Sequence, residues 1–162
     1  MSALPQRIAV TGASGLIGSA LVGHLKSEGH TVQRLVRRLP VSPDEVQWDP
    51  ATGYVDTAAL AGVDAIIHLA GVGVGDKRWN KKFKAQILNS RLLGTEAIAK
   101  AVTELKPQVF ISASAIGWYG ESGNRAVIES DRAGDDFLAA VCREWEAAAD
   151  SAVGVRTVKL RT

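Results

Sequence analysis

Residues 11–18 read TGASGLIG, and this stretch decides the fold of the 162-residue chain. A short apolar run, IAV at residues 8–10, precedes it, and an amphipathic segment follows from Leu16 to Leu25. The pattern predicts a strand that turns sharply on glycines into a helix. Such a turn directs several backbone N–H groups and a helix N-terminus at one point, an arrangement that suits a pyrophosphate.

Each glycine of the stretch has a physical role in a site of this kind. Gly12 permits the tight turn, Gly15 lets the backbone approach the phosphates, and Gly18 lets the helix lie close to the strand. The spacing is G-x-x-G-x-x-G, one residue longer than the G-x-G-x-x-G form. A glycine turn with a purely structural role is the alternative. Because a strand precedes the glycines and a helix follows them, we expect a dinucleotide site.

The composition is that of a soluble globular domain, with 46% hydrophobic and 22% charged residues. A net charge of +2 is too small to indicate binding to nucleic acid or to an anionic membrane. The single cysteine, Cys142, excludes an internal disulfide and favours a reducing compartment. We find no signal peptide before the first strand and no apolar run near the roughly 18 residues that span a bilayer. We therefore expect a cytoplasmic protein.

Strand-like apolar runs alternate with helical patterns, which predicts a parallel sheet covered by helices on both faces. The strand-like runs lie at about residues 7–11, 31–36, 46–48, 65–70, 109–113 and 156–160. The helical patterns lie at about residues 15–28, 58–62, 80–105 and 136–150, and a glycine-rich loop covers 117–134. The fold class is therefore α/β, a doubly wound Rossmann sheet with the strand order 3-2-1-4-5-6.

The residue type at the end of the second strand indicates which dinucleotide is bound. An NAD site carries an acidic residue about 20 residues beyond the glycines, where it binds the ribose 2′-OH. This chain has no Asp or Glu between Thr31 and Pro43 and reads RLVRR at residues 34–38. A guanidinium there can pair with a 2′-phosphate. We assign that contact to Arg37, interpret Arg34 as a solvated surface charge, and predict NADP as the cofactor.

Taken together, these residues resemble the extended short-chain dehydrogenase/reductases, the NAD-dependent epimerase/dehydratase family. The resemblance covers the whole chain and is closest to an epimerase-like subgroup whose function is largely unassigned. Its marks are TGASGLIG, HLAG at 68–71, RWN at 78–80, NSRLLGT at 89–95, SAS at 112–114, AIGWYG at 115–120 and WE at 145–146.

The resemblance implies where the cofactor lies. Leu69, Ala70 and Gly71 are expected along the cofactor near the nicotinamide-side ribose, where small residues allow close approach. It also implies that Asn89 sits inside the fold near the active site, with an ordinary polar helix residue as the alternative. The complete set of predicted cofactor contacts is Gly12, Ser14, Gly15, Leu16, Ile17, Gly18, Arg37, Leu69, Ala70 and Gly71.

The reductases of this family use a Ser and a Tyr-x-x-x-Lys pair, in which the lysine cation lowers the tyrosine pKa for proton exchange. Ser114 is our choice for the serine and Ser112 the second, unless the serine merely caps the loop after the strand. The Tyr-x-x-x-Lys pair is missing. Cys142 falls in the tyrosine position and Glu146 in the lysine position. A carboxylate there would raise the thiol pKa, so we expect a packed helix cysteine rather than a nucleophile.

Two residues could replace the missing pair. Tyr119 follows Ser114 closely and could bring a hydroxyl to the mouth of the site, unless it only packs the loop. Glu146 could act as acid or base if burial raises its pKa, unless it is a surface carboxylate near Arg143. Ser114 and Tyr119 are therefore the predicted catalytic residues.

Other chemistries find no support in the sequence. The three histidines, His24, His30 and His68, are scattered without metal-ligand spacing, so we predict no metal. There is no G-x-S-x-G elbow of a serine hydrolase. A run of cations begins the long helix, and we interpret it as a solvated face, with contact to an anionic substrate or a cofactor phosphate as the alternative; its members are Lys77, Arg78, Lys81, Lys82 and Lys84.

Two functional hypotheses remain. In the first, the chain is an NADP-dependent oxidoreductase or epimerase acting on a small carbonyl or nucleotide-sugar-like substrate. In the second, it is a non-catalytic NADP(H)-binding sensor or regulatory protein. Because the chain ends just after a strand, we expect residues 1–162 to be one NADP-binding domain without its C-terminal substrate-binding portion. We expect no nucleic-acid or membrane partner. The long helix near Asn80 makes a homodimer possible, since relatives often pair there.

Overall fold

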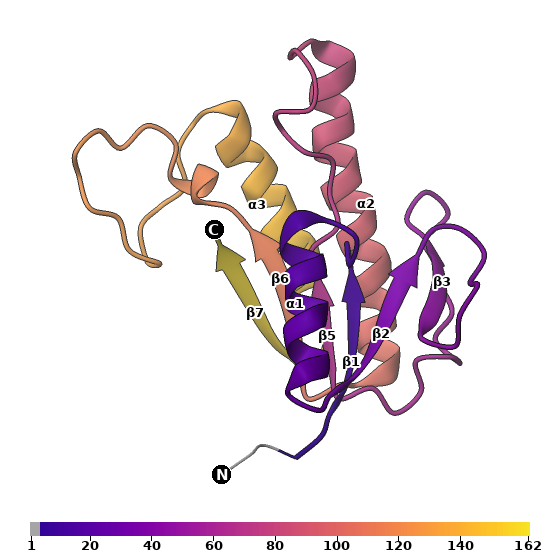
Figure 1. Cartoon of the computed structure of the whole chain (residues 1–162). Coiled ribbons are helices and arrows are strands. Elements are labelled where there is room, and N and C mark those ends of the chain that lie inside the picture. The colour runs from indigo at the N-terminus through magenta and orange to yellow at the C-terminus, as the bar shows by residue number, and fades with distance from the viewer. Residues whose placement is uncertain (1–3) are drawn as a thin grey trace.

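The computed structural model describes residues 4–162 (Figure 1). Its strands form one sheet in the order β4-β3-β2-β1-β5-β6-β7. The strands are β1 (Arg7–Thr11), β2 (Thr31–Val36), β3 (Glu45–Asp49), β4 (Tyr54–Val55), β5 (Ala65–His68), β6 (Val109–Ser114) and β7 (Arg156–Arg161). Every neighbouring pair is parallel except β3 and β4. The predicted order of the six parallel strands is confirmed, and β4 adds a short antiparallel edge.

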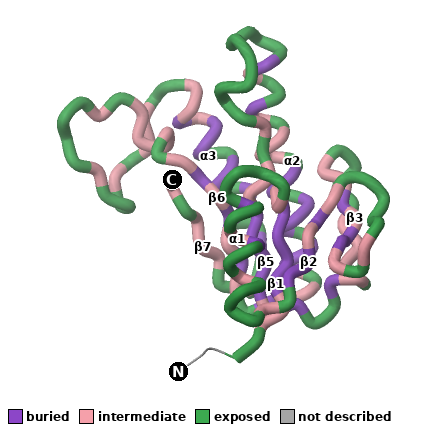
Figure 2. Tube along the Cα trace, in the orientation of Figure 1, coloured by how far each residue is buried: buried purple, intermediate pink, exposed green. Residues whose placement is uncertain are grey.

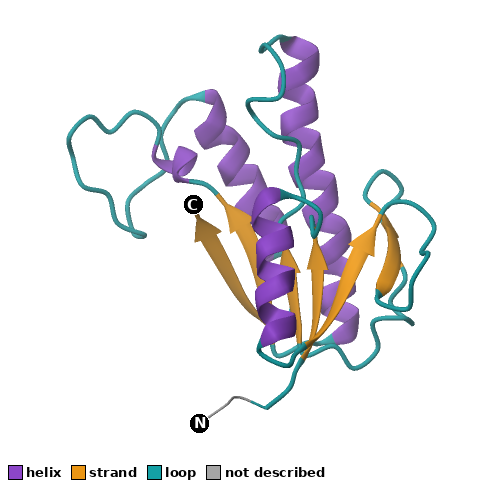
Figure 3. Ribbon diagram, viewed as in Figure 1, coloured by secondary structure: helices purple, strands orange, loops and turns teal. Residues whose placement is uncertain are grey.

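Helices cover both faces of the sheet, as Figures 1 and 3 show. Helix α1 (Leu16–Ser27) lies on one face, and α2 (Lys81–Leu105) and α3 (Phe137–Asp150) lie on the other. Alternate strand residues supply the two cores. Val10, Val32 and Ile67 pack with Val22 of α1, whereas residues that include Ile66 and Phe110 pack with Ile98 of α2 and Ala149 of α3. The buried stretches in Figure 2 follow the central strands and the inner sides of α2 and α3. The fold is therefore the predicted doubly wound α/β sheet.

The two long helices begin where side chains cap them. The Asn80 side chain accepts a hydrogen bond from the Phe83 N–H at 2.9 Å, and the Asp136 side chain accepts one from the Ala139 N–H at 2.8 Å. These caps satisfy N–H groups that have no partner within a helix. Helix α2 ends at Lys106, which adopts a left-handed conformation (φ 53°) just before Pro107. Both helices therefore lie within one residue of their predicted bounds.

Three local predictions are wrong. Residues 58–62 form turns rather than a short helix, because five residues give few helical hydrogen bonds and Gly62 has a positive φ of 76°. The fourth predicted strand ends at His68 instead of residue 70, since the chain there turns towards the glycine loop. The glycine-rich loop begins with a 3₁₀ turn, η1 (Ile116–Tyr119), that the sequence did not predict.

Within residues 4–162 no helix is both long enough and apolar enough to cross a bilayer. The same residues contain no cluster of three or more His, Cys, Asp or Glu side chains placed to hold a metal ion.

Candidate cofactor and active site

The glycine loop has the geometry that its spacing predicts. Gly12 has a φ of 67°, and the Gly15 N–H donates to the Gly12 carbonyl at 3.0 Å, which closes the turn. A Cβ on Gly18 would overlap the Gly12 carbonyl oxygen, so only glycine allows α1 to lie this close to the turn. Helix α1 has no side-chain cap and no acidic residue in its first turn. Its N-terminal N–H groups are therefore available to an anion.

The Thr11 hydroxyl ties this turn to the loop after β5. Its oxygen accepts hydrogen bonds from the N–H groups of Leu69 (3.1 Å) and Ala70 (3.3 Å). It also lies 2.7 Å from Nδ1 of His68. Since the oxygen already accepts two N–H groups, its own proton goes to Nδ1, and His68 carries its ring proton on Nε2. A Cβ on Gly12 would lie 2.9 Å from the Ala70 nitrogen, so the two loops are in direct contact.

A cleft of about 720 Å³ opens at the carboxyl ends of the strands, between the glycine loop, the end of β2 and the loop after β5. Seven of the ten predicted cofactor contacts line it: Gly12, Ser14, Gly15, Arg37, Leu69, Ala70 and Gly71. The other three, Leu16, Ile17 and Gly18, do not. Leu16 and Ile17 point into solvent, and Gly18 is buried beneath the turn.

The cleft also has lining residues that the sequence analysis did not single out. They come from the ends of β2 and β3 and from the loop after β5, and they include Val36, Trp48, Val72, Gly73 and Asp76. The rule that ligands bind outside the carboxyl ends of parallel strands could have found their segments, though not the individual residues.

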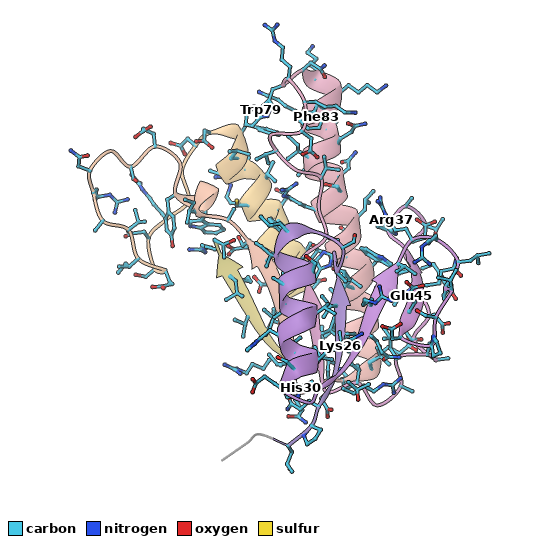
Figure 4. All side chains as sticks on the ribbon, viewed as in Figure 1. Lys26, His30, Arg37, Glu45, Trp79 and Phe83 are labelled. Atoms are coloured by element: carbon cyan, nitrogen blue, oxygen red, sulfur yellow. The ribbon has the colours of Figure 1, made fainter. Side chains whose placement is uncertain are left out.

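Arg34, Arg37 and Arg38, the three arginines at the end of β2, have different surroundings. Arg34 pairs with Asp44 at 3.1 Å, so it is not simply solvated, and Arg38 pairs with Glu45 at 2.6 Å. Arg37 is exposed, lines the cleft and makes no ion pair or side-chain hydrogen bond within residues 4–162. Figure 4 shows Arg37 and Glu45 on the β2–β3 side of the sheet. Of the three, Arg37 alone has a guanidinium free for a ligand.

Glu45 is an acidic residue of the type that binds the ribose in an NAD site, but its carboxylate is already paired within the protein. Its carboxylate accepts hydrogen bonds from Arg38 and from the Val41 N–H. The Arg38 contact is the main cause that lowers the pKa of Glu45 to about 2. The carboxylate therefore stays ionised and neutralised by Arg38 and Arg34.

Ser90 and Arg91, on α2, hold the loop that leads out of the cleft. The Val72 N–H donates to the Ser90 hydroxyl at 3.1 Å, and Nη1 of Arg91 donates to the Val72 carbonyl at 2.9 Å. Asn89, in contrast, is exposed on α2. The expectation that Asn89 sits inside the fold is wrong, because the inward face of this turn is occupied by Ile87, Ser90 and Arg91.

Ser114 and Tyr119 belong to one side-chain network. The Ser114 hydroxyl donates to Oε1 of Glu146 at 2.6 Å. Arg161 grips the same carboxylate with Nε (2.7 Å) and Nη2 (2.9 Å), and its Nη1 donates to the Tyr119 hydroxyl at 3.1 Å. The Arg161 guanidinium also stacks 3.9 Å from the Trp118 ring centre. Neither Ser114 nor Tyr119 lines the cofactor cleft. Ser112, the second choice, is buried and donates to the Ala113 carbonyl.

Glu146 does not have the raised pKa that an acid–base role required. Burial acts to raise its pKa, but hydrogen bonds from Arg161 and Ser114 and the charge of Arg161 outweigh burial, so the pKa is lowered. Glu146 is also 4% exposed and is not a surface carboxylate. Both sequence interpretations of Glu146 are therefore wrong, since neither included the Arg161 guanidinium.

Cys142 is packed, as expected for a structural helix cysteine. It is 3% exposed, and its thiol points to the Ala115 carbonyl at 3.7 Å. Burial first, and the Glu146 charge second, raise the pKa of this thiol, while the charges of Arg91 and Arg161 oppose the change. A raised pKa disfavours the thiolate, which is the nucleophilic form.

The cation run at the start of α2 is mostly exposed. Lys77, Arg78, Lys81 and Lys82 are exposed, whereas Lys84 is half-buried over the rings of Trp79 (5.6 Å) and Phe137 (4.9 Å). Figure 4 shows Trp79 and Phe83 at this end of α2. None of the five cations makes an ion pair within the described part of the chain, which is the solvated arrangement that the sequence analysis favoured.

Comparison with known proteins places this architecture in a family. Residues 8–140 match the model of the NAD dependent epimerase/dehydratase family. An epimerase family protein of Mycobacterium leprae is 44% identical over 157 residues, which are 96% of this chain and 51% of that protein. The human epimerase family protein SDR39U1 is 34% identical over 148 residues, which are 88% of this chain and 48% of that protein. The chain thus spans about half the length of the curated relatives it matches.

Two solved structures are similar in both fold and sequence. A nucleoside-diphosphate sugar epimerase from Corynebacterium glutamicum superposes with a TM-score of 0.83 at 40% identity, covering 97% of this chain and 33% of that one. The human SDR39U1 structure with NADPH superposes with a TM-score of 0.79 at 33% identity, covering 96% of this chain and 52% of that one. With the matched glycine loop, cleft and strand order, these findings show that the chain belongs to the NAD-dependent epimerase/dehydratase family.

Proposed function

We propose that this chain binds NADP(H) and forms the cofactor-binding part of an oxidoreductase or epimerase. The substrate would be a small carbonyl compound or a nucleotide-sugar-like molecule. The observation that carries the choice of NADP(H) is Arg37, which lines the cleft without a carboxylate partner in the described chain. A guanidinium in this position suits a 2′-phosphate, and Glu45 is already neutralised by Arg38. That the human relative was solved with NADPH supports the same choice.

In this proposal the glycine loop holds the pyrophosphate. Ser14 and Gly15 line the cleft next to the uncapped N-terminus of α1, whose dipole favours negative charge. Leu69, Ala70 and Gly71 would lie along the ribose on the nicotinamide side. The cofactor itself supplies hydride transfer when bound.

Ser114 would orient the substrate oxygen, with Tyr119 as the nearby hydroxyl. Because the Ser114 hydroxyl donates to Glu146, its lone pairs are the groups that remain for a ligand. Tyr119 accepts from Arg161, so its own proton can be directed outward. In this arrangement Tyr119, rather than Ser114, is the group that can donate a hydrogen bond to a substrate carbonyl.

The first test is a calorimetric titration of the chain with NADPH and, separately, with NADH. Tight binding of NADPH and weak binding of NADH is the expected result. Equal affinities for NADPH and NADH would support a dinucleotide site but contradict the proposed contact between Arg37 and the 2′-phosphate. Binding of neither would contradict the cofactor assignment for this chain.

A non-catalytic NADP(H) sensor is the second candidate, and one observation favours it. The family's Tyr-x-x-x-Lys pair is missing, and the Ser114 proton is held by Glu146. Incubating the chain with NADPH and a panel of carbonyl compounds separates the candidates, because an enzyme oxidises NADPH and a sensor only binds it. For residues 1–162 alone we expect binding with little or no turnover, and robust turnover would contradict this.

A further inference from the structure

Arg91 is a half-buried cation for which the described chain provides no carboxylate. Arg34, Arg38, Arg125 and Arg161 each pair with an Asp or Glu within 4 Å, whereas Arg91 makes no ion pair within residues 4–162. Burial lowers the pKa of Arg91, which reflects the cost of desolvating a charge. An unpaired charge held partly away from water is unfavourable and therefore uncommon away from functional sites.

The contacts of Arg91 leave one particular edge of its guanidinium unused. Nη1 donates to the carbonyls of Val72 (2.9 Å) and Ile87 (3.2 Å). Nε and Nη2 have no hydrogen-bond partner among residues 4–162, and neither is among the described polar atoms that are sealed from solvent. In Arg34 and Arg161 the same Nε–Nη2 edge grips a carboxylate with two hydrogen bonds. This edge is the planar fork that matches two oxygens of a carboxylate or phosphate.

Arg91 does not itself line the cleft, but it packs against Gly71, which does. A Cβ on Gly71 would be 3.5 Å from Cζ of Arg91, so the guanidinium lies against the loop assigned to the nicotinamide side. On the other side it lies 5.0 Å from the Trp145 ring centre, and its charge acts on the Cys142 thiol of α3. Cys142 in turn contacts Ala115, next to Ser114. Arg91 therefore stands between the cofactor loop and the segment that carries Ser114.

We propose that the Nε–Nη2 edge of Arg91 binds an oxyanion of the substrate, a carboxylate or a phosphate, beside the nicotinamide end of the cleft. The inference rests on the proposed function for the identity of the ligand as substrate.

The test follows the Nε–Hε signals of arginine by NMR in ¹⁵N-labelled chain, with saturating NADPH and without cofactor. Oxalate is titrated in one arm and inorganic phosphate in the other, which separates a carboxylate from a phosphate ligand. We expect one of them to shift the Arg91 signal with a saturating curve. The signal is assigned by its loss in Arg91→Lys. No saturable shift with either anion, in either cofactor state, would overturn the proposal.

Three variants decide whether Arg91 itself is responsible. Arg91→Lys keeps the charge but loses the fork, and we expect about tenfold weaker anion binding with unchanged NADPH affinity. Arg91→Met should abolish anion binding. Arg132→Met, on an exposed arginine without a described hydrogen bond, is the matched control and should bind as the parent chain does. If Arg91→Lys instead weakens NADPH and leaves the anion unaffected, Arg91 is only a clamp for Val72.

Two further outcomes distinguish the proposal from anion binding elsewhere on the surface and from a failure of the proposed function. If Arg78→Met, in the exposed cation run, removes anion binding as completely as Arg91→Met, the anion binds there and the proposal is wrong. Failure of NADPH to bind would overturn the proposed function, whereas the cofactor-free titration would still decide the role of the Arg91 edge. Should Arg91→Met fail to fold, the Arg91→Lys comparison gives the same decision.

Discussion

The carbonyl oxygen of Gly12 occupies the space that a side chain on Gly18 would need. This contact sets the distance between α1 and the turn after β1. It also fixes where the free N–H groups of the helix point, because the helix can lie this close to the turn only when residue 18 has no side chain. Gly23, one and a half turns further along α1, has no atom within 4 Å of the corresponding position.

The two glycines therefore form a matched pair for mutation. Gly18→Ala should destabilise the chain by between about 1 and several kcal/mol. The new methyl group would overlap the Gly12 backbone, and no rotamer change can relieve that overlap. The substitution should also weaken NADPH binding. Gly23→Ala should stabilise the chain by about 0.5–1 kcal/mol through helix propensity. Urea unfolding followed by circular dichroism measures both, and equal effects of the two changes would contradict the packing argument.

Arg37 is predicted to set the preference for NADPH over NADH. Arg37→Gln should weaken NADPH binding by about 10- to 100-fold and leave NADH binding unchanged, because it removes a charge-assisted contact of roughly 1.5–3 kcal/mol that only the 2′-phosphate can make. Arg132→Gln is the control for lost positive charge. Calorimetric titration of each variant with both cofactors gives the comparison. A parallel loss of both affinities would mean that Arg37 acts on the shared part of the cofactor.

Removal of one partner from the buried pair of Glu146 and Arg161 is expected to destabilise the fold strongly. Glu146→Ala leaves Arg161 without its carboxylate and should cost about 3–5 kcal/mol at pH 7. The folded-state pKa of Glu146 is lowered, so its contribution is present above the unfolded pKa and is lost as pH falls through the folded value. The difference between parent and variant should therefore shrink below about pH 4. Glu144→Ala, at an exposed residue of the same helix, is the matched control and should change stability little at pH 7.

His68 should make the fold sensitive to mild acid. Burial lowers its pKa from 6.5 to about 4. Between these values the unfolded chain binds a proton that the folded chain does not, so the free energy of unfolding falls as pH decreases from 6.5 to 4. The loss is on the order of 3 kcal/mol by the usual conversion of a pKa shift.

Denaturant titrations at pH 7 and pH 5 test this sensitivity. His68→Gln should flatten the pH dependence even if it lowers stability at both values, since glutamine does not titrate. A parent chain equally stable at pH 7 and pH 5 would contradict the burial argument.

Local patterns predicted the sheet because each parallel strand is a short apolar run bounded by a turn or a helix. They missed β4, whose two residues, Tyr54 and Val55, are too few to show alternation. They also made residues 58–62 helical, since alanine favours helix and the sequence does not show that Gly62 adopts a positive φ. The geometry of the glycine loop was predictable because consecutive residues determine it.

The site was less predictable where it depends on partners distant in sequence. The reading of Glu146 failed because Arg161 reaches it from β7, fifteen positions away, and no local signal marks that pair. Asn89 and Arg91 are two residues apart on α2, yet one is exposed and the other half-buried. The sequence singled out the Ser90–Arg91 pair as a family mark, but only the structure shows which edge of Arg91 lacks a partner.

Thr11 has a consequence for how binding measurements on this chain are interpreted. One hydroxyl joins the glycine turn, the loop after β5 and the buried His68, so the two walls of the cleft are fastened together before any ligand arrives. A ligand that enters such a preassembled cleft does not have to order its walls, and little conformational entropy is lost on association. Thr11→Val, nearly identical in shape, would release both walls at once. Affinities measured with Thr11 present therefore report the contacts that the cofactor makes, and those measured without it also include the ordering of the loops.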